Sequence, residues 1–565
     1  MKVSEIPYRR YTIEEGQAAY AAFEAAFDAA RSADDVVAAR RIIEKLSDDY
    51  STAYSLAQNH FSLDSRDTFY RAEVDYYDEN SPLFSGLLTR YAEKMLACPF
   101  RAELEKKINP RLFLTYEAAK KSYDDRIVGD LQQENAAVTE YSDFMSSLSF
   151  TFDGEKMPLA VLRGKLEDSD PDVRRRAAVE LDRGLSEHSE ALDAYYDRLV
   201  HLRDAMGKKM GYSSFTELGY YRMCRIDYTA EDVRIFRENV ARDIVPAVCR
   251  VKEAVARRLG VPTITFADAE VYTAGEAPEP VCDKAGMFRE AQTMYDSMNA
   301  TVGDFMRRMQ ENEAFDVDAR EGKCGGGYCT SFPNYRQPFI LANFNGSSGD
   351  VDVLTHEFGH ALADDFHYRE GDWELNVGGM ETAECHSMSM EFFSWKFMDR
   401  FFGKNSDKYR YKHLLSALCF IPYGTAVDEF QHEVYARPDM TPAERDALWL
   451  SLEKKYRPWL DYSGLPYLGR GTRWQYQTHI YEVPFYYIDY CLAQTVSLEL
   501  WAMLQQDQKD AWAHYMAYAR QGGSRTFTEL LKNAGLESPF DEQCLRSVCE
   551  TARKWLDNFD LSGIE

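Results

Sequence analysis

The chain has 565 residues, of which 45% are hydrophobic and 28% are charged, a composition typical of soluble globular proteins. Its 93 acidic and 66 basic side chains give a formal net charge of -27, which disfavours nucleic acids and anionic membrane surfaces as partners. Eleven cysteines without a C-x-x-C pair argue against a disulfide framework, and no apolar run suits a signal peptide or membrane span, so we predict a reducing, cytoplasmic location.

The first two hundred residues contain helix signals in succession. Thr12 and Glu15 have capping-box spacing before an alanine-rich and aromatic segment, 18–30. Ser32 precedes a second segment whose acids come first and whose bases come later, as the helix dipole favours. Asp170 stands directly before a proline, which suits the first position of a helix. These patterns predict a mainly α protein.

Further along the chain, helical patterns continue over residues 230–259 and 285–310. No period of 20 to 50 residues is present, which disfavours a helical repeat scaffold. From Asp316 to Phe344 the composition changes to glycine clusters, two prolines and short β-prone runs. We predict a small sheet here that borders a functional site, with a plain loop as the alternative.

A candidate metal site follows this β-prone segment. Asp350 is a suitable N-cap for a helix that contains His356-Glu357-Phe358-Gly359-His360. Histidines four positions apart project from one face of a helix, one turn apart, so both imidazoles can bind one zinc ion. Glu357 lies beside the first histidine, where its carboxylate can hold a water molecule and accept its proton.

A catalytic zinc ion needs a third protein ligand and an open position for water. No third histidine follows at the spacing of an H-x-x-G-x-x-H extension, so the ligand is sought in the next polar segment. Thr382 is a candidate cap for a second helix that would carry Glu384, which lies 28 positions after His356. Spacing alone does not decide among the candidates, which are Glu381, Glu384, Cys385 and His386. A metal-bound histidine usually donates its other ring N–H to a carboxylate, and the candidates for that carboxylate are Glu381, Glu391 and Asp352.

Three motifs occur in order along the chain: HEFGH, then ECHSMSMEFF with a glutamate 28 residues after His356, and HIYEVPFYYIDY near the C-terminus. In these motifs the chain resembles the oligoendopeptidase F and thimet oligopeptidase family of zinc metallopeptidases, above all the oligoendopeptidase F and Pz-peptidase branch. The resemblance is densest from residue 322 to residue 494. It implies a mainly helical, closed body of two lobes around a deep substrate channel, with zinc near its floor; the small sheet predicted above would lie beside the HExxH helix. We expect residues 1–200 to form an N-terminal helical region of the same body and residues 201–565 to form the zinc metallopeptidase catalytic region.

The resemblance also implies roles for particular residues. The family's E-x-x-S-x-x-x-E pattern falls on Glu384, with Ser387 and Glu391, which makes Glu384 the third ligand. His479 matches the family's histidine that contacts the substrate and the oxyanion. Because tyrosine spacing differs between branches, the tyrosines stay candidates: Tyr486 and Tyr490 for catalysis, and Tyr487 for substrate binding.

The glycine cluster and a nearby arginine supply hypotheses about substrate binding. The backbone at Gly326, Gly327 and Tyr328 can pair with an extended peptide as an added strand. Arg473 can hold a substrate carboxylate with two hydrogen bonds, although a structural arginine is the alternative.

Together these features predict a zinc metalloendopeptidase with one Zn²⁺ per chain that hydrolyses internal bonds of short, unstructured peptides, with a zinc-bound water activated by Glu357. An exopeptidase that removes terminal dipeptides is the second hypothesis, and a non-catalytic helical peptide-binding protein is the third. A binding protein has no use for a general base, so Glu357 disfavours the third. We expect a monomer or a small homo-oligomer.

Overall fold

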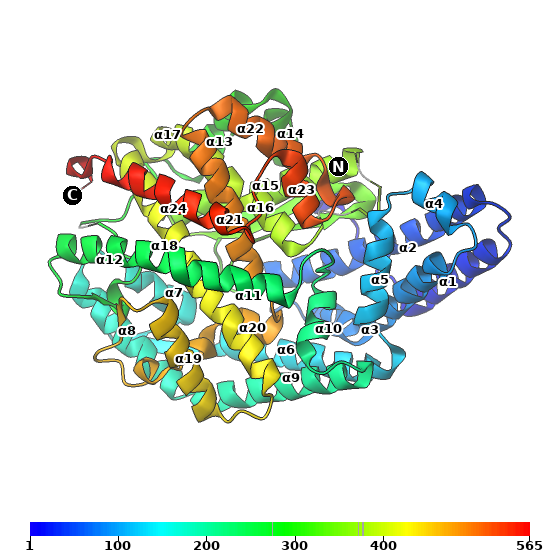
Figure 1. Cartoon of the computed structure of the whole chain (residues 1–565), viewed down its shortest axis with the longest axis horizontal. Helices are drawn as coiled ribbons and strands as arrows, with labels where there is room; N and C mark the ends of the chain where they lie inside the picture. The colour runs from blue at the N-terminus through cyan, green and yellow to red at the C-terminus, as the bar shows by residue number, and fades with distance from the viewer. Residues whose placement is uncertain (274, 371, 376–377, 565) are drawn as a thin grey trace.

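The computed structural model describes residues 1–273, 275–370, 372–375 and 378–564. Most of the chain is helical and the strands are few and short, so the predicted mainly α fold is confirmed. In Figure 1 the N-terminal helices α1 (Ile13–Asp28), α2 (Ala33–Leu63) and α4 (Arg101–Lys107) project to one side of a larger helical body. None of the described helices combines the length and the apolarity needed to cross a bilayer.

The N-terminal helices begin where the sequence predicts. The Thr12 hydroxyl accepts the backbone N–H of Glu15 at 3.3 Å, and the Glu15 carboxylate accepts the backbone N–H of Thr12 at 2.9 Å, which completes the capping box of α1. Ser32 caps α2 by accepting the backbone N–H of Asp35 at 3.2 Å. This region is completed by α3 (Thr68–Leu96) and α5 (Arg111–Ser122).

The middle of the chain is also helical, and Asp170 caps its helix as predicted. A π-helical turn, Val240–Ile244, joins α11 to α12, whereas Asn299 separates α13 from α14 within the region predicted as one helix. The helices are α6 (Val128–Ser147), α7 (Leu159–Gly164), α8 (Pro171–Ser186), α9 (Ser189–Met210), α10 (Phe215–Arg222), α11 (Ala230–Asn239), α12 (Val245–Leu259), α13 (Lys284–Met298) and α14 (Ala300–Glu311).

The second half of the chain forms the centre of the body. Helices α16 and α21 pack against each other there, and Met390, Ile488 and Leu492 are fully buried. The helices are α15 (Gly349–Glu370), α16 (Met380–Phe393), α17 (Met398–Phe402), α18 (Ser406–Ala436), α19 (Pro442–Tyr456), α20 (Thr478–Glu482), α21 (Tyr487–Leu504), α22 (Gln508–Ala519), α23 (Phe527–Ala534) and α24 (Glu542–Asp557).

The small sheet predicted from the glycine-rich segment is present. Strand β6 (Gln337–Phe344) lies between β4 (Phe315–Asp318), to which it is parallel, and β5 (Tyr328–Phe332), to which it is antiparallel. In this sheet β5 is therefore an edge strand, and β6 leads directly into α15. Two other short pairs are β1 (Ser149–Phe152) with β2 (Glu155–Pro158), and β3 (Ile264–Thr265) with β7 (Leu460–Asp461).

A short segment between α15 and α16 is held by the N-terminal helices. Leu375 is buried in the same apolar cluster as the side chains of α1 to α5. The Glu374 carboxylate accepts hydrogen bonds from Arg40 and from Tyr116, the latter at 2.7 Å. Arg40 also pairs with Asp372 at 3.2 Å. The N-terminal helices therefore hold residues 372–375, which lie between α15 and α16, in place.

Candidate metal centre and active site

Helix α15 presents the two histidines of the HEFGH motif on one face. The ring centroids of His356 and His360 lie 5.1 Å apart, as expected for residues one turn apart. Glu357 lies between them in sequence and is 7% exposed. All three side chains are thus held by one regular helix.

The turn that leads from β6 into α15 is braced by Asp350. Its carboxylate accepts the backbone N–H groups of Asn345 and Gly346 at 3.0 and 2.8 Å. Because α15 already begins at Gly349, Asp350 lies inside the first turn, and the prediction that it is the N-cap is wrong. Its hydrogen bonds fix the loop before the helix instead.

The glycine of the motif allows α16 to approach α15 closely. A Cβ atom on Gly359 would lie 2.6 Å from the Cα atom of Ser387 and 2.7 Å from the carbonyl oxygen of His386. Real Cβ atoms do not approach other atoms so closely, so any larger residue would force the helices apart. This contact sets the distance between the histidines and the side chains of α16.

Glu384 of α16 faces both histidines. Its Oε2 atom lies 3.3 Å from Nε2 of His356 and 3.4 Å from Nε2 of His360, and the three potential ligand atoms lie within 4.8 Å of one another. Two imidazole nitrogens and one carboxylate oxygen are a donor set that suits Zn²⁺ and leaves a position for water. The residues therefore fit a catalytic zinc ion.

The other candidates for the third ligand do not join this cluster, as far as the described residues show. Glu381 lies near the buried Arg225 and Asp489, and burial raises its pKa. Both ring nitrogens of His386 are buried without a hydrogen-bond partner in the described chain. Helix α16 begins at Met380, so the prediction that Thr382 caps it is wrong.

His356 is supported by Glu391, one of the three carboxylates considered from the sequence. Nδ1 of His356 lies 2.6 Å from Glu391 Oε1, and Nε2 of His413 lies 2.7 Å from Glu391 Oε2. Trp395 donates its indole N–H to Nδ1 of His413 at 3.1 Å, so the proton of a neutral His413 lies on Nε2. Burial opposes ionisation of Glu391, but these hydrogen bonds outweigh it and lower its pKa to about 2. The chain of contacts directs Nε2 of His356 towards Glu384.

Glu357 is almost enclosed, and burial raises its pKa while His356 and His360 oppose that rise. A bound cation would act in the same direction as the two histidines and lower the pKa of Glu357. Its carboxylate makes no hydrogen bond to the described part of the chain, which leaves its oxygens available to a water molecule.

The C-terminal motif reaches the site at Glu384. The Tyr486 hydroxyl donates a hydrogen bond to Oε1 of Glu384. The rings of Tyr486 and Tyr490 are 4.7 Å apart, and the ring of His479 lies 6.0 and 5.9 Å from them. Burial lowers the pKa of His479 to about 4, so its ring is neutral near pH 7. The structure thus brings His479 and both tyrosines together beside the group of His356, His360 and Glu384.

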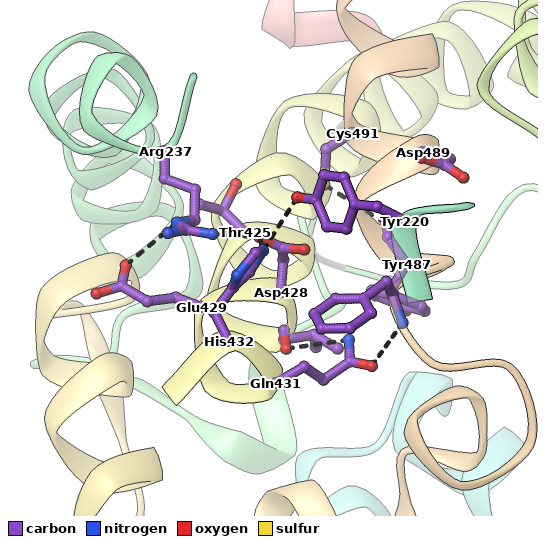
Figure 2. A network of polar contacts seen from close by, with 12 residues as sticks. Tyr220, Arg237, Thr425, Asp428, Glu429, Gln431, His432, Tyr487, Asp489 and Cys491 are labelled. Carbon is purple, nitrogen blue, oxygen red and sulfur yellow. Dashed lines mark hydrogen bonds and ion pairs between the residues drawn. The ribbon is translucent and has the colours of Figure 1, made fainter. Parts of the chain in front are cut away.

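A strained residue positions Tyr486. Phe485 has φ of +67°, a conformation that costs a bulky residue about 1–2 kcal/mol. Its N–H donates to Oε1 of Gln431 at 2.7 Å, and its carbonyl oxygen accepts from Arg225 at 2.6 Å. These two hydrogen bonds hold the strained peptide in place. Figure 2 shows Gln431 within this buried network on α18.

The same network contains His432 and Asp428 (Figure 2). Nε2 of His432 lies 3.1 Å from the Tyr220 hydroxyl, and Arg237 donates to Asp428 at 2.6 Å. Burial lowers the pKa of His432 to about 4. The network packs behind the tyrosine motif and holds it in place.

A cavity of about 370 Å³ adjoins the site. His479, Tyr487 and Tyr490 line one wall, whereas Glu391 and His413 line another. Tyr487, a predicted substrate-binding residue, therefore borders space that a substrate side chain can enter.

The predicted substrate-binding residues outside the cavity have different environments. Gly326 has φ of +88° in an exposed turn, and Asn343 donates to its carbonyl oxygen at 2.8 Å. Gly327 follows it, and the Tyr328 hydroxyl bonds Asn59 of α2 at 3.2 Å, so this side chain is turned towards the N-terminal helices. The backbone of this segment, rather than the Tyr328 side chain, is therefore the candidate for pairing with a peptide.

Arg473 is packed between aromatic rings. Its guanidinium lies 3.8 Å from the ring centroid of Tyr476 and 4.9 Å from that of Tyr423. Its Nε and Nη1 atoms are buried without a hydrogen-bond partner, and no described carboxylate forms an ion pair with it. The cation is therefore not neutralised within the described chain.

Three residues beside the site carried no signal in the sequence. His413 supports Glu391, Gln477 contacts His479, and Tyr423 contacts Gln477. All three lie in the stretch where the family resemblance is densest, and Gln477 is two positions from His479, but nothing in the spacing marks any of them out. His413 and Tyr423 reach the site from α18 through the fold.

Comparison with known proteins gives two family matches. Residues 3–123 match the Peptidase M3 N-terminal domain, and residues 287–549 match Peptidase family M3. Among curated proteins, Oligopeptidase PepF of Bacillus subtilis (strain 168) is 22% identical over 296 residues, which is 50% of this chain. That match spans 43% of the length of the curated relative.

Solved structures are similar over nearly the whole chain. One structure, provisionally named oligoendopeptidase F, is 42% identical, with 99% of both chains covered and a TM-score of 0.96. Pz peptidase A, solved with an inhibitor, is 41% identical, with 99% of this chain and 100% of that chain covered and a TM-score of 0.96.

Proposed function

Because the chain belongs to peptidase family M3, we propose that it is a zinc-dependent oligoendopeptidase that hydrolyses internal bonds of short, unstructured peptides. The observation that carries this proposal is the group of His356, His360 and Glu384, with Glu357 beside it and a cavity next to it. The proposal includes a cytoplasmic location and a monomer or small homo-oligomer.

In this proposal His356, His360 and Glu384 hold one Zn²⁺ ion. When bound, the ion supplies a Lewis acid that lowers the pKa of water towards about 7 and polarises a carbonyl group. Glu357 holds the attacking water through its carboxylate, accepts one of its protons and passes that proton to the leaving amine. The almost enclosed position of Glu357 keeps bulk water from competing for this carboxylate.

His479, Tyr486 and Tyr490 act on the other side of the peptide. In this proposal His479 and Tyr490 can each direct a hydrogen bond at the oxygen on which negative charge develops, and Tyr486 can do so when its hydroxyl turns away from Glu384. The pKa of each tyrosine hydroxyl is raised by burial, so both keep their protons at neutral pH and stay donors. Losing one such donor typically lowers kcat by about 10²- to 10³-fold.

The edge strand β5 suits an extended substrate. Its backbone pairs with β6 on one side only, so the opposite edge can accept a peptide as an added strand. Backbone pairing tolerates varied side chains, which fits a peptidase that acts on many short peptides. The turn at Gly325, Gly326 and Gly327 would let the peptide approach closely.

The direct test of this function uses a short peptide blocked at both ends. The zinc-loaded protein should cut it internally, a chelator should abolish cleavage, and added Zn²⁺ should restore it. Product masses distinguish this from the second candidate, because an exopeptidase would leave the blocked peptide intact and release dipeptides from an unblocked one. A zinc-loaded protein that cuts neither peptide would contradict the proposal and favour a binding role.

We expect Arg473→Ala to impair cleavage of peptides with a free carboxyl terminus more than cleavage of their amides. The guanidinium has no described ion-pair partner, and a hydrogen bond to a charged group contributes about 1.5–3 kcal/mol. That corresponds to a loss of roughly 10- to 100-fold in kcat/KM for the free acid. Kinetics with matched acid and amide peptides measure the difference. Equal losses for both would assign Arg473 to packing against Tyr423 and Tyr476.

A further inference from the structure

The ring of His479 is held through its Nδ1 atom. Nε2 of Gln477 lies 3.0 Å from it, and the hydroxyl of Thr478 lies 3.5 Å from it. The second distance is at the limit for a hydrogen bond, so Gln477 is the main partner. Gln477 is 7% exposed and is therefore protected from competing water.

The other end of the Gln477 amide is held by Tyr423. The Tyr423 hydroxyl donates to Oε1 of Gln477, and no other described acceptor lies within hydrogen-bond distance of it. With the amide reversed, Tyr423 would have to accept from Gln477, and its own proton would lack an acceptor in the described chain. Hydrogen-bond satisfaction therefore favours the orientation in which the amide N–H groups face His479.

Two cations strengthen this direction. The guanidinium groups of Arg457 and Arg473 lie 4.7 and 4.9 Å from the ring centroid of Tyr423. Their positive potential makes the phenol a better donor and a poorer acceptor. The hydrogen bonds therefore run in one sense, from Tyr423 to Gln477 to His479.

An imidazole whose Nδ1 accepts a hydrogen bond carries its single proton on Nε2 while it is neutral. The ring of His479 borders the cavity together with Tyr487 and Tyr490, and Nε2 is the ring nitrogen that Gln477 does not hold. In the opposite tautomer a bare Nε2 would repel a developing oxyanion.

We propose that Gln477 is a positioning residue that fixes His479 in the Nε2–H tautomer, so that the neutral ring can only donate a hydrogen bond into the site. This inference rests on the proposed function, because it assigns the use of that proton to stabilising the oxyanion. Tyr423 contributes to the same positioning, because its hydrogen bond keeps the amide of Gln477 from reversing its orientation.

The test uses the fact that an ionised carboxylate can accept hydrogen bonds but cannot donate one. In Gln477→Glu the new side chain draws the proton of the neutral ring to Nδ1, whereas Gln477→Leu removes the partner altogether. We expect kcat of Gln477→Glu to fall roughly 10²-fold with KM near the wild-type value, because a donor to the oxyanion is lost while substrate binding is kept. Thr478→Val is the comparison: because its hydroxyl lies at the limit of hydrogen-bond distance from Nδ1, this variant should lower kcat far less than Gln477→Glu does.

The tautomer itself is read from the ¹⁵N spectrum of zinc-loaded, histidine-labelled protein, with the His479 signals identified by their absence in His479→Gln. In wild type, Nδ1 should show the shift of an unprotonated ring nitrogen and Nε2 that of a protonated one. In Gln477→Glu the two should exchange. A wild-type ring protonated on Nδ1, or a Gln477→Glu enzyme with wild-type kcat, would overturn the inference. Because the spectrum needs no turnover, a protein that fails to cut peptides would refute the proposed function and still leave the tautomer measurable.

Discussion

Replacing Glu357 with Gln is expected to abolish peptide hydrolysis while one Zn²⁺ per chain stays bound. The amide has the size of the carboxylate and can still accept a hydrogen bond from water, but it cannot take up a proton. General-base catalysis contributes about 10²- to 10⁴-fold, so kcat should fall by at least that range. The metal should remain because the cluster of potential ligands consists of His356, His360 and Glu384.

The measurement combines metal analysis with hydrolysis of a quenched, blocked peptide. Glu433→Gln is a matched control, because it makes the same chemical change on α18 at a half-exposed carboxylate paired with Arg437. It should keep both zinc and activity. A Glu357→Gln protein that retains most of its activity would show that another group accepts the proton. Loss of zinc from it would assign Glu357 to metal binding instead.

Replacing Glu384 with Ala should remove the zinc ion and, with it, activity. The substitution leaves two histidines where a catalytic site uses three protein ligands. Since changing a residue that only supports a ligand already costs about 10- to 100-fold in metal affinity, loss of a ligand should cost more than about 100-fold. Titration with a competing chelator measures the affinity, and circular dichroism checks that the helices remain.

Glu381→Gln is the control that makes this result specific. Glu381 lies three residues before Glu384, on the same helix, and was one of the competing candidates from spacing. Burial and the nearby Asp489 raise its pKa, so the amide imitates its protonated form. Zinc affinity should stay at the wild-type value. Wild-type affinity in Glu384→Ala, or a large loss in Glu381→Gln, would reassign the third ligand.

Much of this architecture could be predicted because its signals are local. The capping box at Thr12, the cap at Asp170 and the paired histidines depend on residues within one or two turns, and the structure contains each feature. Asp350 and Thr382 were misplaced because a capping residue type also serves other hydrogen bonds near a helix start.

The geometry of the site itself was less accessible to sequence reasoning. Glu381 and Glu384 share a helix face, so only the crossing of α15 and α16 at Gly359 distinguishes them. His413 and Tyr423 reach the site from α18 by tertiary packing, which no spacing rule describes. The resemblance to a family pointed to Glu384, whose carboxylate lies beside both histidines in the structure, but it held no information on the partners of His479.

The grip of the N-terminal helices on residues 372–375 bears on how such a chain can evolve. Although its two family matches fall on separate stretches, residues 3–123 and 287–549, these stretches are not interchangeable modules. Arg40 of the first holds Glu374 of the second, within the connection between the histidine-bearing helix and the glutamate-bearing helix. If recombination replaced the first stretch alone, the new stretch would have to supply an arginine for Glu374 and a pocket for Leu375. The two stretches are therefore expected to be inherited together.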